Sequence, residues 1–157
     1  MKKIDFLIKL AKKRVLEIVE PSEEIKESYI KKSENSIISA KILLGSGQLE
    51  NSIALSYYGM YNLLTALLFK AGIKCENHNG SILILKEIFN FDNLDILNAK
   101  KERIDKQYYT DFHITKEDVT QAIKDAEIFN NKLLDFISRM NNKDVQNYRD
   151  KLKEAIN

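Results

Sequence analysis

Hydrophobic residues recur every three or four positions along most of the chain, which is the spacing of one face of an α-helix. This pattern predicts six or seven helical segments, at about 4–19, 22–44, 50–71, 81–89, 94–111, 116–140 and 142–157. No stretch alternates apolar and polar residues as a half-buried strand does, and no internal repeat or low-complexity tract appears. The sequence therefore predicts an all-α protein.

Turn and capping residues mark where the predicted helices begin and end. Pro21 separates the first helix from the second, because proline is tolerated only in the first turn of a helix, and residues 45–47 (Gly-Ser-Gly) stop the second. Gly72 suits the left-handed position after the third helix. Residues 77–80 (Asn-His-Asn-Gly) form a turn, and residues 115–118 resemble a capping box with Asp in place of the usual Glu.

The helix order and the composition together predict an up-down bundle of four to five helices with extra N- and C-terminal helices. Five glycines and one proline are too few for the many turns of a β-sandwich or barrel. With 157 residues, 44% of them hydrophobic and 31% charged, the chain is long enough for one domain with a sizeable core. We expect an N-terminal flanking helix at 1–20, the helical bundle at 22–140 and a C-terminal helical tail at 142–157.

The third predicted helix contains LSYYGMYNLL, residues 55–64, which places three tyrosines and a glycine in an otherwise apolar run. Tyr57 and Tyr61 lie one turn apart on one face, and Tyr58 lies about 100° round the helix. Gly59 costs about 1 kcal/mol inside a helix, a cost that close approach of another helix would offset. Core tyrosines packed at a helix crossing explain the stretch, and the edge of a binding site is the alternative.

The fifth predicted helix is the most polar segment in the middle of the chain. Lys100 and Arg103 fall on one face, Lys106 extends the positive charge, and Tyr108 lies on the neighbouring apolar stripe. One interpretation is a solvated face whose charges pair locally, as surface charges usually do. The other is a phosphate site, in which the arginine binds the phosphate and a tyrosine stacks or donates a hydrogen bond.

The common metal, cofactor and nucleotide motifs are absent. The chain has no P-loop, no G-x-G-x-x-G, no H-E-x-x-H and no C-x-x-C. Two histidines, His78 and His113, and the single Cys75 cannot by themselves form an ordinary zinc site, and neither histidine has the Glu-x-x-His spacing of a di-iron bundle. We therefore predict no metal and no cofactor, and we regard Cys75 as an inert thiol.

Charge and cysteine content favour a cytoplasmic protein. The net charge of +2 does not by itself indicate a nucleic-acid binder, and one cysteine fits a reducing compartment. Residues 1–14 carry charge throughout and lack the apolar core of a signal peptide. The apolar run at 53–71 contains Ser, Asn, Thr and Lys, so it predicts a buried helix rather than a membrane span.

Taken together, these stretches resemble the HEPN family (higher eukaryotes and prokaryotes nucleotide-binding domain), in particular its small stand-alone prokaryotic members. The residues that carry the resemblance stand in the family's order: Ala54, Ser56, Tyr57, Tyr58, His78, Gly80, Arg103 and Tyr108. Gly59 and Tyr61 replace an Ala and a Phe that the family usually has, and residues 105–107 depart from its Ala-Asp pair. The resemblance covers about 25–137.

HEPN domains are four- or five-helix bundles, commonly homodimers, and many are metal-independent ribonucleases with an Arg-x4-6-His motif near the dimer seam. The resemblance implies Arg103 and Tyr108 as candidate catalytic residues. It also implies six candidate residues for binding nucleotide or RNA: Lys100, Arg103, Lys106, Tyr57, Tyr58 and His78. The motif lacks its histidine here, because residues 108–110 are Tyr-Tyr-Thr, and tyrosine, with a pKa of about 10, is poorly matched to acid–base catalysis at neutral pH.

Three functions remain open at this point. The first is a HEPN-like protein with a degenerate ribonuclease motif that binds nucleotide or RNA, as a toxin–antitoxin component or as the partner of a minimal nucleotidyltransferase. The second is an active metal-independent RNase toxin that uses Arg103 with Tyr108, or with His78 from elsewhere in a dimer. The third is a helical protein-interaction module without a nucleotide site. We expect a homodimer without membrane association.

Overall fold

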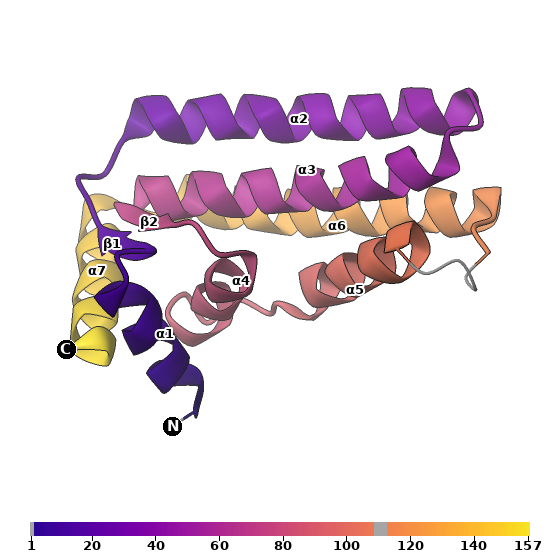
Figure 1. Ribbon diagram of the computed structural model, residues 1–157. Coiled ribbons are helices and arrows are strands. Elements are labelled where there is room, and N and C mark those ends of the chain that lie inside the picture. Colours follow the sequence, from indigo (N-terminus) through magenta and orange to yellow (C-terminus); the bar gives the residue numbers. More distant parts are fainter. Residues whose placement is uncertain (1, 109–112) are drawn as a thin grey trace.

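The computed structural model describes residues 2–108 and 113–157, apart from the side chains of Gln107 and Tyr108. Over these residues the chain forms seven helices and one two-stranded sheet (Figure 1). Their bounds are α1 Lys2–Lys12, β1 Leu16–Ile18, α2 Glu23–Gly45, α3 Leu49–Lys70, β2 Ile73–Cys75, α4 His78–Glu87, α5 Leu94–Tyr108, α6 Lys116–Arg139 and α7 Asn142–Ile156. The predicted all-α class is confirmed.

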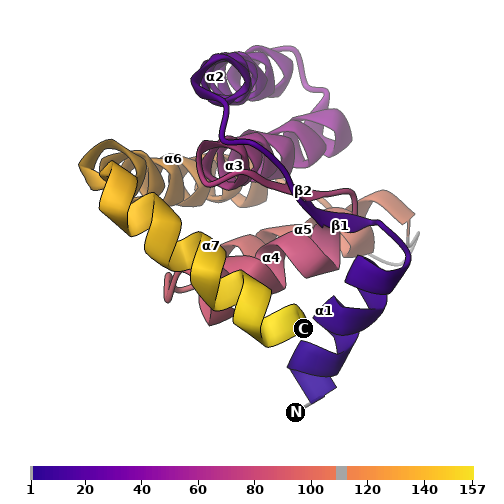
Figure 2. The same ribbon diagram turned by 90° about the vertical axis from the view of Figure 1, so that its left-hand side faces the viewer.

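The three longest helices, α2, α3 and α6, run side by side along the length of the molecule (Figure 1). The central one is α3, which contacts α2 and α6, while α4 and α5 lie against its side away from α2. Figure 2 shows α1 and α7 at one end of the long helices, where the two contact each other. The architecture is therefore the predicted up-down bundle with an added helix at each terminus.

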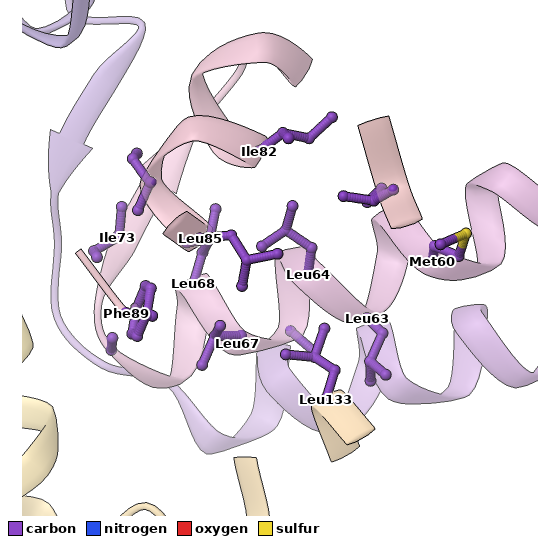
Figure 3. Packing of buried hydrophobic residues seen from close by; sticks show 14 of the residues in the cluster. Met60, Leu63, Leu64, Leu67, Leu68, Ile73, Ile82, Leu85, Phe89 and Leu133 are labelled. Atoms are coloured by element: carbon purple, nitrogen blue, oxygen red, sulfur yellow. The ribbon is translucent and has the colours of Figure 1, made fainter. Parts of the chain in front are cut away.

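The centre of the core is α3, whose side chains are buried on almost every side. Figure 3 shows Leu64 and Leu67 of this helix in one cluster with Phe89 and with Leu133 of α6. By length and composition α3 could cross a membrane, but 67% of its most apolar window is buried inside the bundle. A helix that is apolar all round is typical of the interior of a bundle, which agrees with the prediction of a buried helix.

Gly59 lies where α3 approaches α2 closely. A Cβ atom at this position would lie 2.8 Å from Cγ1 of Ile37 and closer still to its Cδ1. The Ser33 hydroxyl on α2 donates to the Gly59 carbonyl at 2.6 Å, and the Ser52 hydroxyl on α3 donates to the Ala40 carbonyl at the same distance. The predicted close approach of another helix at Gly59 is confirmed.

The N-terminal segment corrects two predictions. The helix expected over 4–19 ends at Lys12, and Arg14 then takes a left-handed φ of 57°. Residues 16–18 pair antiparallel with residues 73–75, so the expectation of no strand is wrong. A strand of three residues is too short to show alternation, and its apolar residues also fit the helical stripe, so local pattern could not reveal the pairing.

The fourth helix also begins earlier than predicted. Instead of a turn at 77–80 and a helix from Ser81, Asn77 is the N-cap and its side chain accepts from the Gly80 amide at 2.8 Å, so α4 starts at His78. This brings His78 into the first turn of a helix. The end predicted for the fifth helix, at residue 111, lies outside the described residues.

Caps confirm the other predicted boundaries. Gly72 follows α3 with a φ of +69°, and the side chain and backbone of Thr115 and Asp118 form the capping box of α6.

Arg149 connects the C-terminal helix to the end of α3. Nη1 of Arg149, on α7, donates to the carbonyls of Val19, Ala71 and Gly72 at 2.7, 2.9 and 3.1 Å. The C-terminal helix is thereby attached to the junction of α3 and the small sheet.

Candidate functional site

Three tyrosines of α3 surround the first residue of α4. The hydroxyl of Tyr57 lies 2.8 Å from Nδ1 of His78. The ring of Tyr61 stacks on the imidazole, with centroids 3.7 Å apart and planes 13° apart, and the Tyr58 ring meets it edge-on at 6.2 Å. The Tyr61 hydroxyl lies 3.1 Å from the Ser81 hydroxyl. These contacts hold His78 in one position and one orientation.

Two cations from α5 complete the arrangement. The guanidinium carbon of Arg103 lies 5.2 Å from the Tyr57 ring centroid and 5.4 Å from that of Tyr58, and its Nη1 donates to the Tyr58 hydroxyl at 3.3 Å. Lys100, one turn earlier on the same face, donates to the side-chain oxygen of Asn79. Five of the predicted site residues thus lie together. We call them the basic aromatic cluster: Tyr57, Tyr58, His78, Lys100 and Arg103.

The remaining candidates lie elsewhere or outside the description. Lys106 is placed against the start of α6, where its ammonium donates to the His113 carbonyl at 2.7 Å and lies 3.5 Å from the Asp118 carboxylate. The side chain of Tyr108, the second candidate catalytic residue, lies outside the described residues. The catalytic assignment of Arg103 and Tyr108 stays a prediction.

Burial separates the cluster into an inner and an outer part. Tyr57 is 1% exposed, so it supports His78 from inside rather than reaching a ligand, whereas Tyr58, His78, Lys100 and Arg103 are half-buried. Burial, followed by the neighbouring Tyr61, raises the pKa of Tyr57 far above its ordinary value. The Tyr57 hydroxyl therefore keeps its proton at neutral pH.

The hydrogen bond to Tyr57 indicates that His78 is a neutral ring with its proton on Nε2. Within the described residues, the buried hydroxyl of Tyr57 has one hydrogen bond, to Nδ1, so it donates there to satisfy its hydrogen. Nδ1 is then the acceptor, and Nε2 carries the ring proton. Burial, and after it the charges of Lys100 and Arg103, lower the pKa of His78, which keeps the ring neutral near pH 7.

This arrangement suits the binding of an anion better than proton transfer. A ring that accepts at Nδ1 and is protonated at Nε2 has no nitrogen lone pair left to act as a general base. It is instead a hydrogen-bond donor beside an ammonium and a guanidinium, the groups that bind phosphate oxygens in proteins. Among the described residues no three His, Cys, Asp or Glu side chains are grouped to hold a metal ion.

Two supporting residues were not predicted as part of the site. The sequence predicts Tyr61 as a packing residue, although its one-turn spacing from Tyr57 places both rings on the face that meets His78. It predicts Asn79 in a turn. Because α4 starts at His78, the Asn79 side chain instead lies in the first helical turn and meets Lys100. Spacing within α3 could have indicated Tyr61, but no local signal indicates Asn79.

Fold and site define a class: an all-α bundle whose central helix, short fourth helix and fifth helix enclose a cationic, aromatic cluster. A family model for the HEPN domain matches residues 26–137, more than half of the chain, and the protein belongs to the HEPN domain family. At the level of the family, this supports a function related to nucleotides or RNA. The predicted family resemblance is confirmed, whereas the division at 1–20, 22–140 and 142–157 stays a prediction.

The chain is also similar to the UPF0332 protein PH1297 of Pyrococcus horikoshii, with 41% identity over 56 residues. The aligned part covers 36% of this chain and 39% of that protein, so it spans well under half of either.

Proposed function

We propose that this protein binds the phosphate groups of RNA or of nucleotides at the basic aromatic cluster. The observation that carries the proposal is the position of Arg103, whose guanidinium packs over the rings of Tyr57 and Tyr58 and beside Lys100 and His78. Guanidinium groups held on aromatic rings keep a fixed orientation, which favours binding of a phosphate at a fixed place.

The electrostatics of the cluster support an anionic ligand. Burial, followed by the charge of Arg103, lowers the pKa of Lys100, and both cations lower the pKa of His78. Among the described residues, the charges that act on the imidazole are therefore positive. A phosphate placed there would offset the repulsion between the two cations and accept a hydrogen bond from Nε2 of His78.

The same geometry favours binding over cleavage. The family's Arg-x4-6-His motif lacks its histidine in this chain, since residues 108–110 are Tyr-Tyr-Thr. His78 is not an obvious replacement, because its Nδ1 accepts from Tyr57. We therefore propose a HEPN-type protein that binds RNA or nucleotide and has a degenerate ribonuclease motif. An active RNase toxin is the second candidate, supported by the presence of Arg103.

The biological setting belongs to the same proposal. The family resemblance supports a cytoplasmic homodimer that works in a toxin–antitoxin pair or beside a minimal nucleotidyltransferase. A buried central helix, α3, supports a protein that does not reside in a membrane. A test for the partner is co-purification of this chain with a minimal nucleotidyltransferase encoded beside it.

The binding proposal is tested with a fluorescent single-stranded RNA over a range of salt concentrations. Replacing Arg103 by Ala removes a charge-assisted contact worth about 1.5–3 kcal/mol, so the Kd should rise about 10- to 150-fold. Lys100→Ala should weaken binding and reduce the salt slope by about 0.7 per lost phosphate contact. Lys101→Ala is the matched control, because it removes the same charge from an exposed neighbour on α5.

Each outcome separates the candidates. Equal binding by the wild type and by both cluster variants would refute the site. RNA cleavage by the wild type that is lost in Arg103→Ala would favour the RNase toxin. No binding to RNA or nucleotide even at low salt, where phosphate contacts are strongest, would favour the interaction module.

A further inference from the structure

A pocket of about 400 Å³ opens beside the basic aromatic cluster, between α2, α3 and β2. Its walls include Tyr29, Tyr58, Tyr61, Asn62, Phe69 and His78. The volume falls within the range of small-molecule sites in proteins. Tyr58 and His78 belong both to the pocket and to the cluster, so a ligand in the pocket would lie next to the cations of α5.

Two stacked pairs of rings give the pocket flat walls. On one side the Tyr61 ring lies on the imidazole of His78 at 3.7 Å between centroids. On another, Tyr29 of α2 lies on Phe69 of α3 at 5.8 Å, with planes 10° apart. All four side chains line the pocket and are half-buried. Flat aromatic walls fit a planar ring better than a branched aliphatic group.

Polar groups stand among these rings. The Asn62 amide, which donates to the Ser36 hydroxyl at 3.3 Å, and the Thr65 hydroxyl, which donates to the Tyr61 carbonyl at 3.0 Å, both line the pocket. An amide and a hydroxyl can also accept, and His78 donates at Nε2. Donors and acceptors of this kind match the edges of a heterocycle that carries both.

We propose that this pocket takes one unpaired nucleobase whose phosphate lies on Arg103 and Lys100. The inference rests on the proposed phosphate binding and adds a base site to it. The chemistry recognised is a nucleobase joined to a phosphate, and it can come from a single-stranded RNA or from a free nucleotide. The aromatic walls account for the base, and the two cations account for the phosphate. An aromatic side chain of a protein partner could fill the pocket but would carry no phosphate for the cations.

The first test compares a short unstructured RNA with an abasic chain of the same length and charge. The wild type should bind the RNA at least about fivefold more tightly, which is the low end of the effect of one base–aromatic stack. Equal binding of the two chains would refute the base site and leave phosphate binding intact. Binding of neither chain at low salt would refute both proposals.

The second test fills the pocket without replacing any residue of the cluster. Thr65→Phe places a ring in the space, and it should lower RNA binding to the level of the abasic chain while abasic binding stays as in the wild type. Thr65→Ser, which keeps the hydroxyl and adds no volume, is the matched control and should retain the preference for bases. A Thr65→Phe protein that still prefers RNA would overturn the proposal.

A third measurement needs no variant and separates the two sources of the base. Amide chemical shifts of the wild type are recorded with adenosine monophosphate, uridine monophosphate, ribose 5-phosphate and the short RNA of the first test. The nucleotides should shift the signals of Asn62 and Thr65, and ribose 5-phosphate should shift only signals near Lys100. Shifts with the oligomeric RNA but not with the mononucleotides would assign the site to RNA. Identical shifts with ribose 5-phosphate and the nucleotides would overturn the base site.

Discussion

Replacing Tyr57 by Phe tests how His78 is held. The change removes one hydroxyl and keeps the ring that packs against Tyr61 and Arg103. It leaves Nδ1 of a half-buried imidazole without its donor at 2.8 Å, which should cost about 1–3 kcal/mol of unfolding free energy. Because the lost bond stabilises the neutral ring, the pKa of His78 should rise toward its ordinary value, and the proton should no longer be confined to Nε2.

The assay is nitrogen-15 NMR of the histidine ring, recorded through a pH titration, together with denaturant unfolding. Tyr61→Phe is the matched control, since it removes a hydroxyl bonded to Ser81 at 3.1 Å and keeps the ring stacked on His78. It should cost stability without changing the tautomer. If Tyr57→Phe leaves both the ring-nitrogen shifts and the pKa of His78 unchanged, the hydroxyl does not hold the tautomer and the reasoning fails.

Three further predictions concern packing and pH. Gly59→Ala should lower the free energy of unfolding, measured with denaturant, by about 0–2 kcal/mol, because overpacking against Ile37 costs about 1–3 kcal/mol and the higher helix propensity of alanine returns about 1 kcal/mol. Adding Ile37→Val to this variant should relieve the loss. Gly72→Ala should lower the midpoint of thermal unfolding, because alanine is strained at a φ of +69° and its Cβ would lie 2.9 Å from the Pro21 nitrogen. The free energy of unfolding should fall as the pH drops below about 6.5, because the pKa of His78 is lower in the folded protein and the unfolded chain therefore binds this proton more readily. His78→Gln should reduce this fall.

The helices could be predicted from local signals because each depends on residues close in sequence. The stripe of apolar residues, the Thr115–Asp118 capping box and the left-handed Gly72 each act within one or two turns. The face that carries Lys100 and Arg103 follows from helical spacing alone. The same reasoning failed for residues 16–18, because their strand exists only through pairing with residues 73–75.

The site likewise divides into features that local sequence signals predict and contacts that they do not. Helical spacing and the family resemblance named Tyr58, His78 and Arg103 as residues of one site, and the structure brings them together. The hydrogen bond between Tyr57 and His78 joins residues 21 apart, and the one between Arg103 and Tyr58 joins residues 45 apart. Such contacts depend on how helices are placed against one another, which periodicity does not specify.

By itself the sequence determined the class of fold, the order of the helices, the burial of α3 and the cationic face of α5, because periodicity, capping and charge spacing are local properties. Only the tertiary structure decided that Tyr57 and Tyr61 hold His78 as a neutral donor, and that an aromatic pocket lies next to the cations. The reason is physical: packing α3 against α4 and α5 buries these groups, and burial sets both their hydrogen-bond partners and their pKa.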